Sequence, residues 1–525
     1  MLKLPAIFSD HMVLQRNKNI AVWGESSPGI VTVSLNNCTV ETEVQNGKWE
    51  LFLPPHKAGG PYQMVIKNGN DVINFNDIII GEVWLAGGQS NMEFELQNST
   101  GGSDIIKNAS GDNVRFYYTP KVAWKGEELY KAEEESSWSK FNPLDCKIWS
   151  AAGYHFADKL SKRLGVTVGI IGCNWGGTSA SCWISRNFLK QVPCLSSYLE
   201  EYDNIVKDQD EAEYIKELEE YFIYQEEFNK NASHYFETAK NPTWEEAEEL
   251  FGKSRYPGPM GPRSANRPCG LYESMLARIM PYTIAGFLYY QGEEDSNKPY
   301  TYYELLLTLV KQWRHDWKDE TLPFMVVQLP VFQDEREPDY KNWPFIREAQ
   351  MRLYNNIKNT GIAVILECGE YNNIHPVDKE PVGERLMLQA MYHVYGGISA
   401  QEAFGPVYKS HYTEGNKMYI KFQYADPQVL FQKEDKSQGI ICSEENETNF
   451  EIAGADKKYF PAEAAIKGDS VILWSASVKK PMYARYFWTN YNKVTLFGEN
   501  GIPVAPFRTS YEDGSKVLGT DIQIS

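Results

Sequence analysis

The sequence predicts a doubly wound α/β domain between two β-rich regions. From about residue 81 to 404, apolar strand-like segments alternate with helix-like segments, which is typical of right-handed βαβ crossovers in a mostly parallel sheet. The first 80 residues and those after Gly405 instead contain short strand-like segments separated by turns. We therefore expect three domains, at 1–80, 81–404 and 405–525, since 525 residues exceed one ordinary core.

The N-terminal region is predicted to form a small β-sandwich. Alternating segments such as NIAVWG, IVTVSL and KWELFL are separated by turn signals, with hairpin turns at Asn46-Gly47 and Asn68-Gly69. At Asp77 the pattern changes to DIIIGEVWLAGGQSN, an apolar run that ends in glycines. Such a run is typical of a buried parallel strand that leads into a loop.

The middle region supplies the other strands and helices of the predicted sheet. Its strand candidates are VTVGIIGCN, IAGFLYY, FMVVQLP and GIAVILE, and its helix candidates include AGYHFADKLSKRLG, YYELLLTLVKQWRHDW, FIREAQMRLYNNI and VGERLMLQAMYHVYG. Residues 195–255 interrupt the alternation with an acidic, helix-favouring insertion. We interpret its charges as a solvated helix face, with a lid over the active site as the alternative.

Composition and charge exclude several classes of function. A formal net charge of −18 argues against nucleic-acid binding. The sequence contains no run of about 18 apolar residues, so no membrane span is expected. The N-terminal MLKLPAIFSDHMVLQR does not resemble a signal peptide, which predicts a cytoplasmic protein unless a leader has been removed. No His, Cys and carboxylate cluster has metal-ligand spacing, so neither a metal nor a cofactor is expected. Nothing in the sequence indicates an oligomeric state.

Unusual polar groups follow three of the predicted strands, at the sheet edge where α/β proteins bind ligands. Ser90 lies in Gly87-Gly88-Gln89-Ser90-Asn91-Met92, where a tight turn can expose its hydroxyl beside free N–H groups. An ordinary helix-capping serine would have the same local pattern. Gly176-Gly177 and Gln291 follow two further strands and offer backbone and amide N–H donors, although the paired glycines could equally form a simple turn.

His375 is the predicted base among eight histidines. It alone follows a sheet strand in the α/β region and precedes a proline, whereas the others fall within helix patterns, β-rich flanks or the acidic insertion. A serine hydroxyl needs a nearby base to attack at neutral pH, and histidine is the usual one. Ser90 and His375 are distant in sequence but follow strands of one predicted sheet, so they can meet.

These segments, in order, resemble the sialate O-acetylesterase family, a branch of the SGNH hydrolases. The matching blocks are FSDHMVLQR, IIGEVWLAGGQSNM, VGIIGCNWGGTSASCW, YYQGEED, LPFMVVQLP, REAQ, IHPVDKEPVGERL and ARYFWTNY…GIPVAPFRT. The resemblance implies a flavodoxin-like core with flanking β-domains and the hydrolysis of acetyl esters on sugars. It further implies Ser90 as nucleophile, His375 as base, and oxyanion donors from the Ser90 N–H, the Gly176-Gly177 backbone and the Gln291 amide.

The sequence departs from this pattern at the third catalytic position. Many SGNH hydrolases have an aspartate three residues before the histidine, where this chain has Asn372. An asparagine carbonyl can orient a histidine, and Glu370, Glu367 or Asp378 could substitute as a carboxylate. A backbone carbonyl could also orient the ring. We expect a Ser–His dyad or an Asn372-assisted pair.

The substrate is predicted to be an acetylated sialic acid or an acetylated hemicellulose-type oligosaccharide. A sialic acid carboxylate would need a cation, for which Arg263 and Arg267 are candidates, although surface or structural roles suit both better. The alternative function is a carbohydrate-binding protein with a degenerate esterase core. The 14 Trp residues and the absent aspartate favour that alternative, whereas the presence of Ser90, Gly177, Gln291 and His375 together argues against it.

Overall fold

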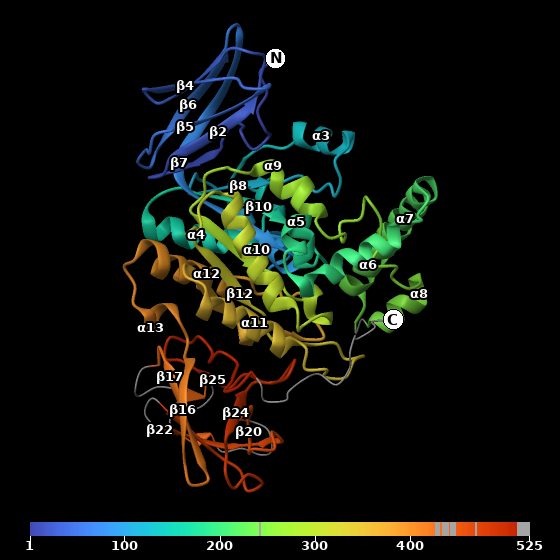
Figure 1. Ribbon diagram of the computed structural model, residues 1–525, viewed down its shortest axis with the longest axis vertical. Coiled ribbons are helices and arrows are strands. Elements are labelled where there is room, and N and C mark those ends of the chain that lie inside the picture. Colours follow the sequence, from blue (N-terminus) through green and yellow to red (C-terminus); the bar gives the residue numbers. More distant parts are fainter. Residues whose placement is uncertain (241–242, 426–430, 433–439, 442–447, 468–469, 512–525) are drawn as a thin grey trace.

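The computed structural model describes residues 1–525 except 241–242, 426–430, 433–439, 442–447, 468–469 and 512–525 (Figure 1). Strands from the N-terminal part of the chain lie at one end of the molecule and strands from the C-terminal part at the other. The parallel sheet and its helices lie between them. The active-site candidates all belong to this middle layer.

Six parallel strands form the central sheet, as the alternating pattern predicts. Their order is β8 (Val114–Tyr118), β10 (Val168–Asn174), β7 (Asp71–Gly88), β11 (Gly286–Tyr290), β12 (Phe324–Gln328) and β14 (Thr360–Val364). A short antiparallel strand, β9 (Ser139–Lys140), adds to β8. The chain first adds β8 and β10 on one side of β7 and then adds β11, β12 and β14 on the other side. The strand order therefore reverses at β7. A ligand crevice is expected beyond the carboxyl end of β7.

Helices cover both faces of this sheet. Trp84 of β7 packs on Phe156 of α4 (Ala151–Leu164), while a side chain at Gly87 would meet Trp313 of α10 (Tyr302–Asp316). Positions three apart on a strand point to opposite faces, so α4 and α10 lie on opposite sides. Helix α12 (Glu380–Ala390) packs beside α4, and α11 (Trp343–Asn356) packs beside α10. The mixed α/β fold class is confirmed.

The N-terminal strands build antiparallel sheets that merge with the central one. Strand β2 (Ile20–Glu25) pairs with β5 (Lys48–Leu53), and β3 (Ile30–Leu35) pairs with both β4 (Cys38–Glu43) and β6 (Gly59–Asn68). Strand β6 then pairs with the first half of β7, and β1 (Val13–Gln15) runs parallel to its middle. Strand β7 is therefore continuous over 18 residues and crosses the predicted boundary near residue 80.

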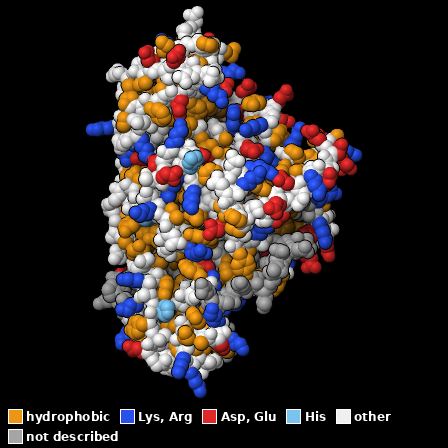
Figure 2. All heavy atoms as spheres, viewed as in Figure 1, with side chains coloured by type: hydrophobic (Ala, Val, Ile, Leu, Met, Phe, Trp, Pro, Cys, Tyr) orange, Lys and Arg blue, Asp and Glu red, His pale blue; other side chains and the backbone are white. Residues whose placement is uncertain are grey.

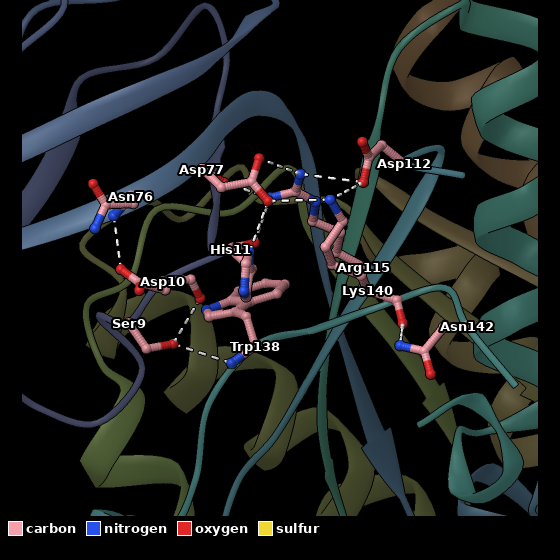
Figure 3. Close-up of polar contacts among 10 residues, drawn as sticks. All are labelled: Ser9, Asp10, His11, Asn76, Asp77, Asp112, Arg115, Trp138, Lys140 and Asn142. Atoms are coloured by element: carbon pink, nitrogen blue, oxygen red, sulfur yellow. Dashed lines mark hydrogen bonds and ion pairs between the residues drawn. The ribbon is translucent and has the colours of Figure 1, made fainter. Parts of the chain in front are cut away.

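Asp77 lies where β7 passes from one sheet to the other, and an ionic cluster holds it there (Figure 3). Its φ is 55°, a left-handed conformation that is rare inside a strand. The fully buried Arg115 donates to the Asp77 carboxylate at 3.0 Å and to its carbonyl at 2.6 Å, and His11 contacts the same carboxylate at 2.7 Å. Burial would raise the pKa of Asp77, but hydrogen bonds from His11, Arg115 and Lys140 outweigh it and hold the pKa at about 2.

Replacing Asp77 with asparagine is expected to lower the free energy of unfolding by about 2–3 kcal/mol, because Arg115 would lose its main counter-charge. The lowered pKa stabilises the fold above the ordinary pKa of aspartate, and this contribution disappears as the pH falls from about 4 to about 2. Denaturant unfolding of the variant and of an Asp112→Asn control checks this. Asp112 contacts Arg115 from a half-exposed position, so its replacement is expected to lower the free energy of unfolding less. An equal loss in both variants would contradict this explanation.

The C-terminal region forms two antiparallel sheets around a second apolar core. One sheet has the order β16 (Val407–Glu414), β17 (Lys417–Gln423), β23 (Ser470–Trp474), β22 (Glu463–Lys467) and β19 (Ile440–Ile441). The other has the order β21 (Tyr459–Pro461), β20 (Phe450–Ala453), β24 (Tyr483–Tyr486) and β26 (Phe507–Arg508), and β18 (Phe431–Gln432) pairs with β25 (Leu496–Phe497). Parts of the predicted 405–525 domain, including most of the segment QGIICS, lie outside the described residues.

The acidic insertion is helical, as its composition predicts. It forms α6 (Ser196–Val206), the long α7 (Glu211–Thr238) and α8 (Trp244–Phe251), which protrude from the side of the central domain (Figure 1). The remaining short helices are α1 (Ser90–Glu93), α2 (Gly102–Lys107), α3 (Glu127–Glu134), α5 (Arg186–Lys190), α9 (Ala277–Ile279) and α13 (Ala400–Ala403). Among the residues described, no helix has the length and apolar character that crossing a membrane requires.

Acidic and basic side chains are interspersed over the face shown in Figure 2. Among the described residues of this face, the lysines and arginines do not gather into one continuous surface. A phosphate backbone needs such a surface, so this face does not suit a nucleic acid.

Candidate active site

Ser90 lies in the crevice beyond the carboxyl end of β7. Strand β7 ends at Gly88, and Ser90 begins the four-residue helix α1. Gly88 has a φ of 137°, and a Cβ there would lie 2.1 Å from the Tyr290 carbonyl oxygen. Only glycine fits this approach, so the Gly-Gly-Gln turn positions Ser90 between β10 and β11.

His375 meets Ser90 from the loop that follows β14. The His375 Nε2 lies 2.8 Å from the Ser90 Oγ, a hydrogen bond between residues that are 285 positions apart. Burial and, to a smaller extent, the positive charge of Lys379 lower the pKa of His375 to about 4, against the opposing charge of Glu93. The imidazole is therefore neutral at pH 7 and has a basic nitrogen available for the hydroxyl proton.

Neither predicted orienting residue contacts the imidazole through its side chain. The Asn372 Oδ1 accepts from the Glu335 N–H at 3.2 Å, so this side chain is directed at the neighbouring loop. The Glu370 carboxylate accepts from the Asn373 amide at 2.8 Å and from the Val377 N–H at 3.0 Å. Glu370 thus holds the two sides of the His375 loop together.

The predicted oxyanion donors are only partly free. The Gly176 N–H donates to Glu93 Oε2 at 2.7 Å, and the Gln291 Nε2 donates to Asp295 Oδ2 at 2.6 Å and to the Thr178 carbonyl at 3.3 Å. Both donors are therefore bound to other groups in this structure, and their role in an oxyanion hole stays a prediction. Gln291 is fully buried and its carbonyl oxygen accepts from the Tyr302 hydroxyl, which locks this orientation.

The N–H groups of Ser90 and Gly177 have no acceptor among the residues that the structure describes. Gly176 packs directly against Ser90, since a Cβ on it would lie 3.3 Å from the Ser90 Cβ. Gly177 has a φ of 64°, and its carbonyl accepts from the Tyr256 hydroxyl at 2.8 Å. Tyr256 follows the acidic insertion, so this part of the chain reaches the active-site loop.

A buried polar network beneath the dyad was not predicted from the sequence. The Asn91 amide donates to the Glu293 carboxylate at 2.6 Å and to the Ile374 carbonyl at 2.9 Å, while the Lys379 Nζ donates to the Asn91 oxygen at 2.6 Å. Asn91 follows Ser90, and Ile374 precedes His375, so this amide ties the two catalytic segments together. The members of this network lie in the sequence blocks GQSNM, QGE and IHPVDKE. The charged and amide residues beside the predicted catalytic residues were the sequence feature that could have indicated the network.

The chain is similar to known carbohydrate esterases. Residues 263–376 match the family described as carbohydrate esterase, sialic acid-specific acetylesterase. Sialate O-acetylesterases of Mus musculus and Homo sapiens are each 24% identical over 96% of this chain, covering 94% and 92% of those proteins. The crystal structure of a carbohydrate acetylesterase from Xanthomonas citri covers 97% of this chain and all of its own, with a TM-score of 0.76 and 27% identity.

The chain is similar to sialate O-acetylesterases over nearly its whole length. The resemblance seen in its sequence blocks is confirmed, since its homologues are sialate O-acetylesterases and carbohydrate acetylesterases. The similarity extends over the flanking β-regions as well as the central sheet, because both the curated relatives and the solved structure cover nearly the whole chain.

Proposed function

We propose that Ser90 and His375 hydrolyse O-acetyl esters of carbohydrates through an acetyl-enzyme. The observation that carries this proposal is the 2.8 Å contact between the Ser90 Oγ and the His375 Nε2. A neutral imidazole at this distance can take the hydroxyl proton as the oxygen attacks the acetyl carbonyl carbon. No metal or cofactor is needed for this sequence of steps.

In the first half-reaction, the Ser90 Oγ forms a bond to the acetyl carbon while the His375 Nε2 takes the proton. The tetrahedral oxyanion would accept from the free N–H groups of Ser90 and Gly177. Collapse breaks the bond to the sugar oxygen, which leaves with the proton from His375. Water then attacks the acetyl carbon with His375 as base, and acetate and free Ser90 result.

The substrate is an O-acetylated sugar, either an acetylated sialic acid or an acetylated hemicellulose-type oligosaccharide. The names of the relatives support the first and the wider carbohydrate acetylesterase class supports both. Acetate release from a panel of such sugars tests the proposal. Release from at least one sugar is the expected result, whereas sugar binding without any release would favour a carbohydrate-binding role.

The pH profile of kcat/KM is expected to have an acidic limb near pH 4–5. His375 must be neutral to act as a base, and its protonated form is disfavoured by burial and by Lys379, so activity is retained until the pH falls toward about 4. Measuring kcat/KM for a neutral acetyl ester from pH 3.5 to 8 checks this. An acidic limb near the ordinary histidine pKa of about 6.5 would contradict it.

Replacing Asn372 with glycine is expected to change kcat by less than about threefold, whereas loss of a true third triad member costs about 10⁴-fold. The Asn372 side chain is directed at Glu335, and glycine tolerates the backbone φ of 56° at this position. Steady-state acetate release is the measurement. A hundredfold fall in kcat at an unchanged melting temperature would make Asn372 the missing member.

A further inference from the structure

A cavity of about 350 Å³ opens beside His375 and offers a place for the sugar. Aromatic side chains line part of it: Trp244 of α8, Phe332, Tyr340 and Trp343. The Phe332 and Trp343 rings are in contact, with centroids 5.1 Å apart. Aromatic walls with a few polar groups are typical of small-molecule sites, and rings of this kind pack on the apolar faces of sugars.

The charge of this cavity is unsuited to an anionic sugar. Two carboxylates line it, from Asp334 and Glu337, and Arg336 is the one lysine or arginine that lines it in the described part of the chain. One edge of the Arg336 guanidinium is bound by the Asp334 carboxylate, with Nε–Oδ1 at 2.9 Å and Nη2–Oδ2 at 2.7 Å. This bidentate geometry occupies one of the two guanidinium edges that can receive a carboxylate side-on, and it balances the positive charge of Arg336.

Other cations near the dyad are also engaged. Lys121 forms an ion pair with Glu93, and Lys379 is fully buried with its Nζ on Asn91. The two arginines suggested by the sequence for a sialic acid carboxylate do not line the cavity. Arg263 lies 3.7 Å from Glu128, and Arg267 donates to Glu273 at 2.9 Å.

We infer that the Asp334–Arg336 pair and Glu337 select a neutral O-acetylated sugar over one that carries a carboxylate. This inference rests on the proposed function and names its substrate class. The charges of the Asp334–Arg336 pair cancel, so the carboxylate of Glu337 leaves the lining with a net negative charge that repels a substrate anion. With water in the cavity, such repulsion amounts to about a three- to tenfold difference in kcat/KM at low ionic strength.

A matched pair of substrates tests this inference: an O-acetylated sialic acid and its carboxyl methyl ester, which differ in charge at the same sugar. The ester is expected to have the higher kcat/KM, by about three- to tenfold at 10 mM salt, with the ratio approaching one as salt screens the repulsion. A free acid that is hydrolysed as well as the ester, or better, would overturn the inference. The proposed function would survive that result, and would fail only if neither compound nor any neutral acetylated sugar released acetate.

Variants assign the effect to the named residues. Asp334→Asn frees Arg336 and is expected to raise the acid-to-ester ratio of kcat/KM about three- to tenfold, and Glu337→Gln to raise it less. The control is Glu335→Gln, which removes a carboxylate from the same loop that does not line the cavity. A ratio that rises equally in the control, or that does not rise in Asp334→Asn, would overturn the assignment.

Discussion

Replacing Ser90 with alanine is expected to lower kcat for an acetylated sugar by about 10⁴–10⁶-fold, the range seen when a serine hydrolase loses its nucleophile. The loss follows because the Ser90 Oγ lies 2.8 Å from the His375 Nε2, and no other hydroxyl among the described residues forms a hydrogen bond with this nitrogen. The remaining oxyanion donors would leave a small residual rate. Acetate release measured at saturating substrate gives the comparison.

The control for this variant is Ser103→Ala, which removes an exposed hydroxyl from α2. Its kcat is expected to equal that of the wild type. Both variants should unfold at the wild-type temperature, because the half-exposed Ser90 hydroxyl contributes little to packing. Activity that persists in Ser90→Ala would require a different nucleophile.

Replacing Lys379 with methionine is expected to lower the free energy of unfolding by about 3–5 kcal/mol, the usual cost of leaving a buried charge without its counter-charge, here Glu293 across Asn91. Burial lowers the pKa of Lys379 to about 8, and the opposing charge of Glu293 keeps the ammonium form in place at pH 7. Without the Lys379 ammonium, the Asn91 oxygen loses its hydrogen-bond donor and the Glu293 carboxylate loses a nearby positive charge. The Asn91 contact to Ile374 should loosen, so kcat is expected to fall about 10–100-fold as His375 moves relative to Ser90.

A double variant separates charge from packing at this position. In Lys379→Met/Glu293→Gln the unpaired carboxylate is removed, so at least half of the lost stability should return, whereas the loss in kcat should remain. Denaturant unfolding and acetate release measure the two effects. A single variant as stable as the wild type would show that the pair carries no net stabilisation.

The sequence pattern was sufficient to predict the arrangement of the central sheet and the proximity of Ser90 and His375. Parallel strands deliver their following loops to one edge, so Ser90 after β7 and the His375 loop after β14 were expected to meet. The course of β7 was not predicted. Its pattern changes at Asp77, but the strand continues because Arg115, His11 and Lys140, all distant in sequence, hold the left-handed residue in place.

The partners of individual polar groups were beyond what the sequence could predict. Gln291 and Gly176 follow the expected strands, yet Asp295 and Glu93 occupy their N–H groups. Glu370 lies close to His375 in sequence but binds the backbone and Asn373 of its loop. In each case the choice among nearby acceptors depends on side-chain rotamers and packing, and neither leaves a periodic signal in the sequence.

The most direct test of the account is to quench the enzyme during turnover of an activated acetyl ester and to map the acetylated peptide by mass spectrometry. The account predicts an acetyl group on Ser90, formed in a rapid first phase and lost as acetate appears. It also predicts that the adduct is absent from Ser90→Ala. Acetate release at the wild-type rate with the acetyl group on another residue, or with Ser90→Ala fully active, would contradict the central claim.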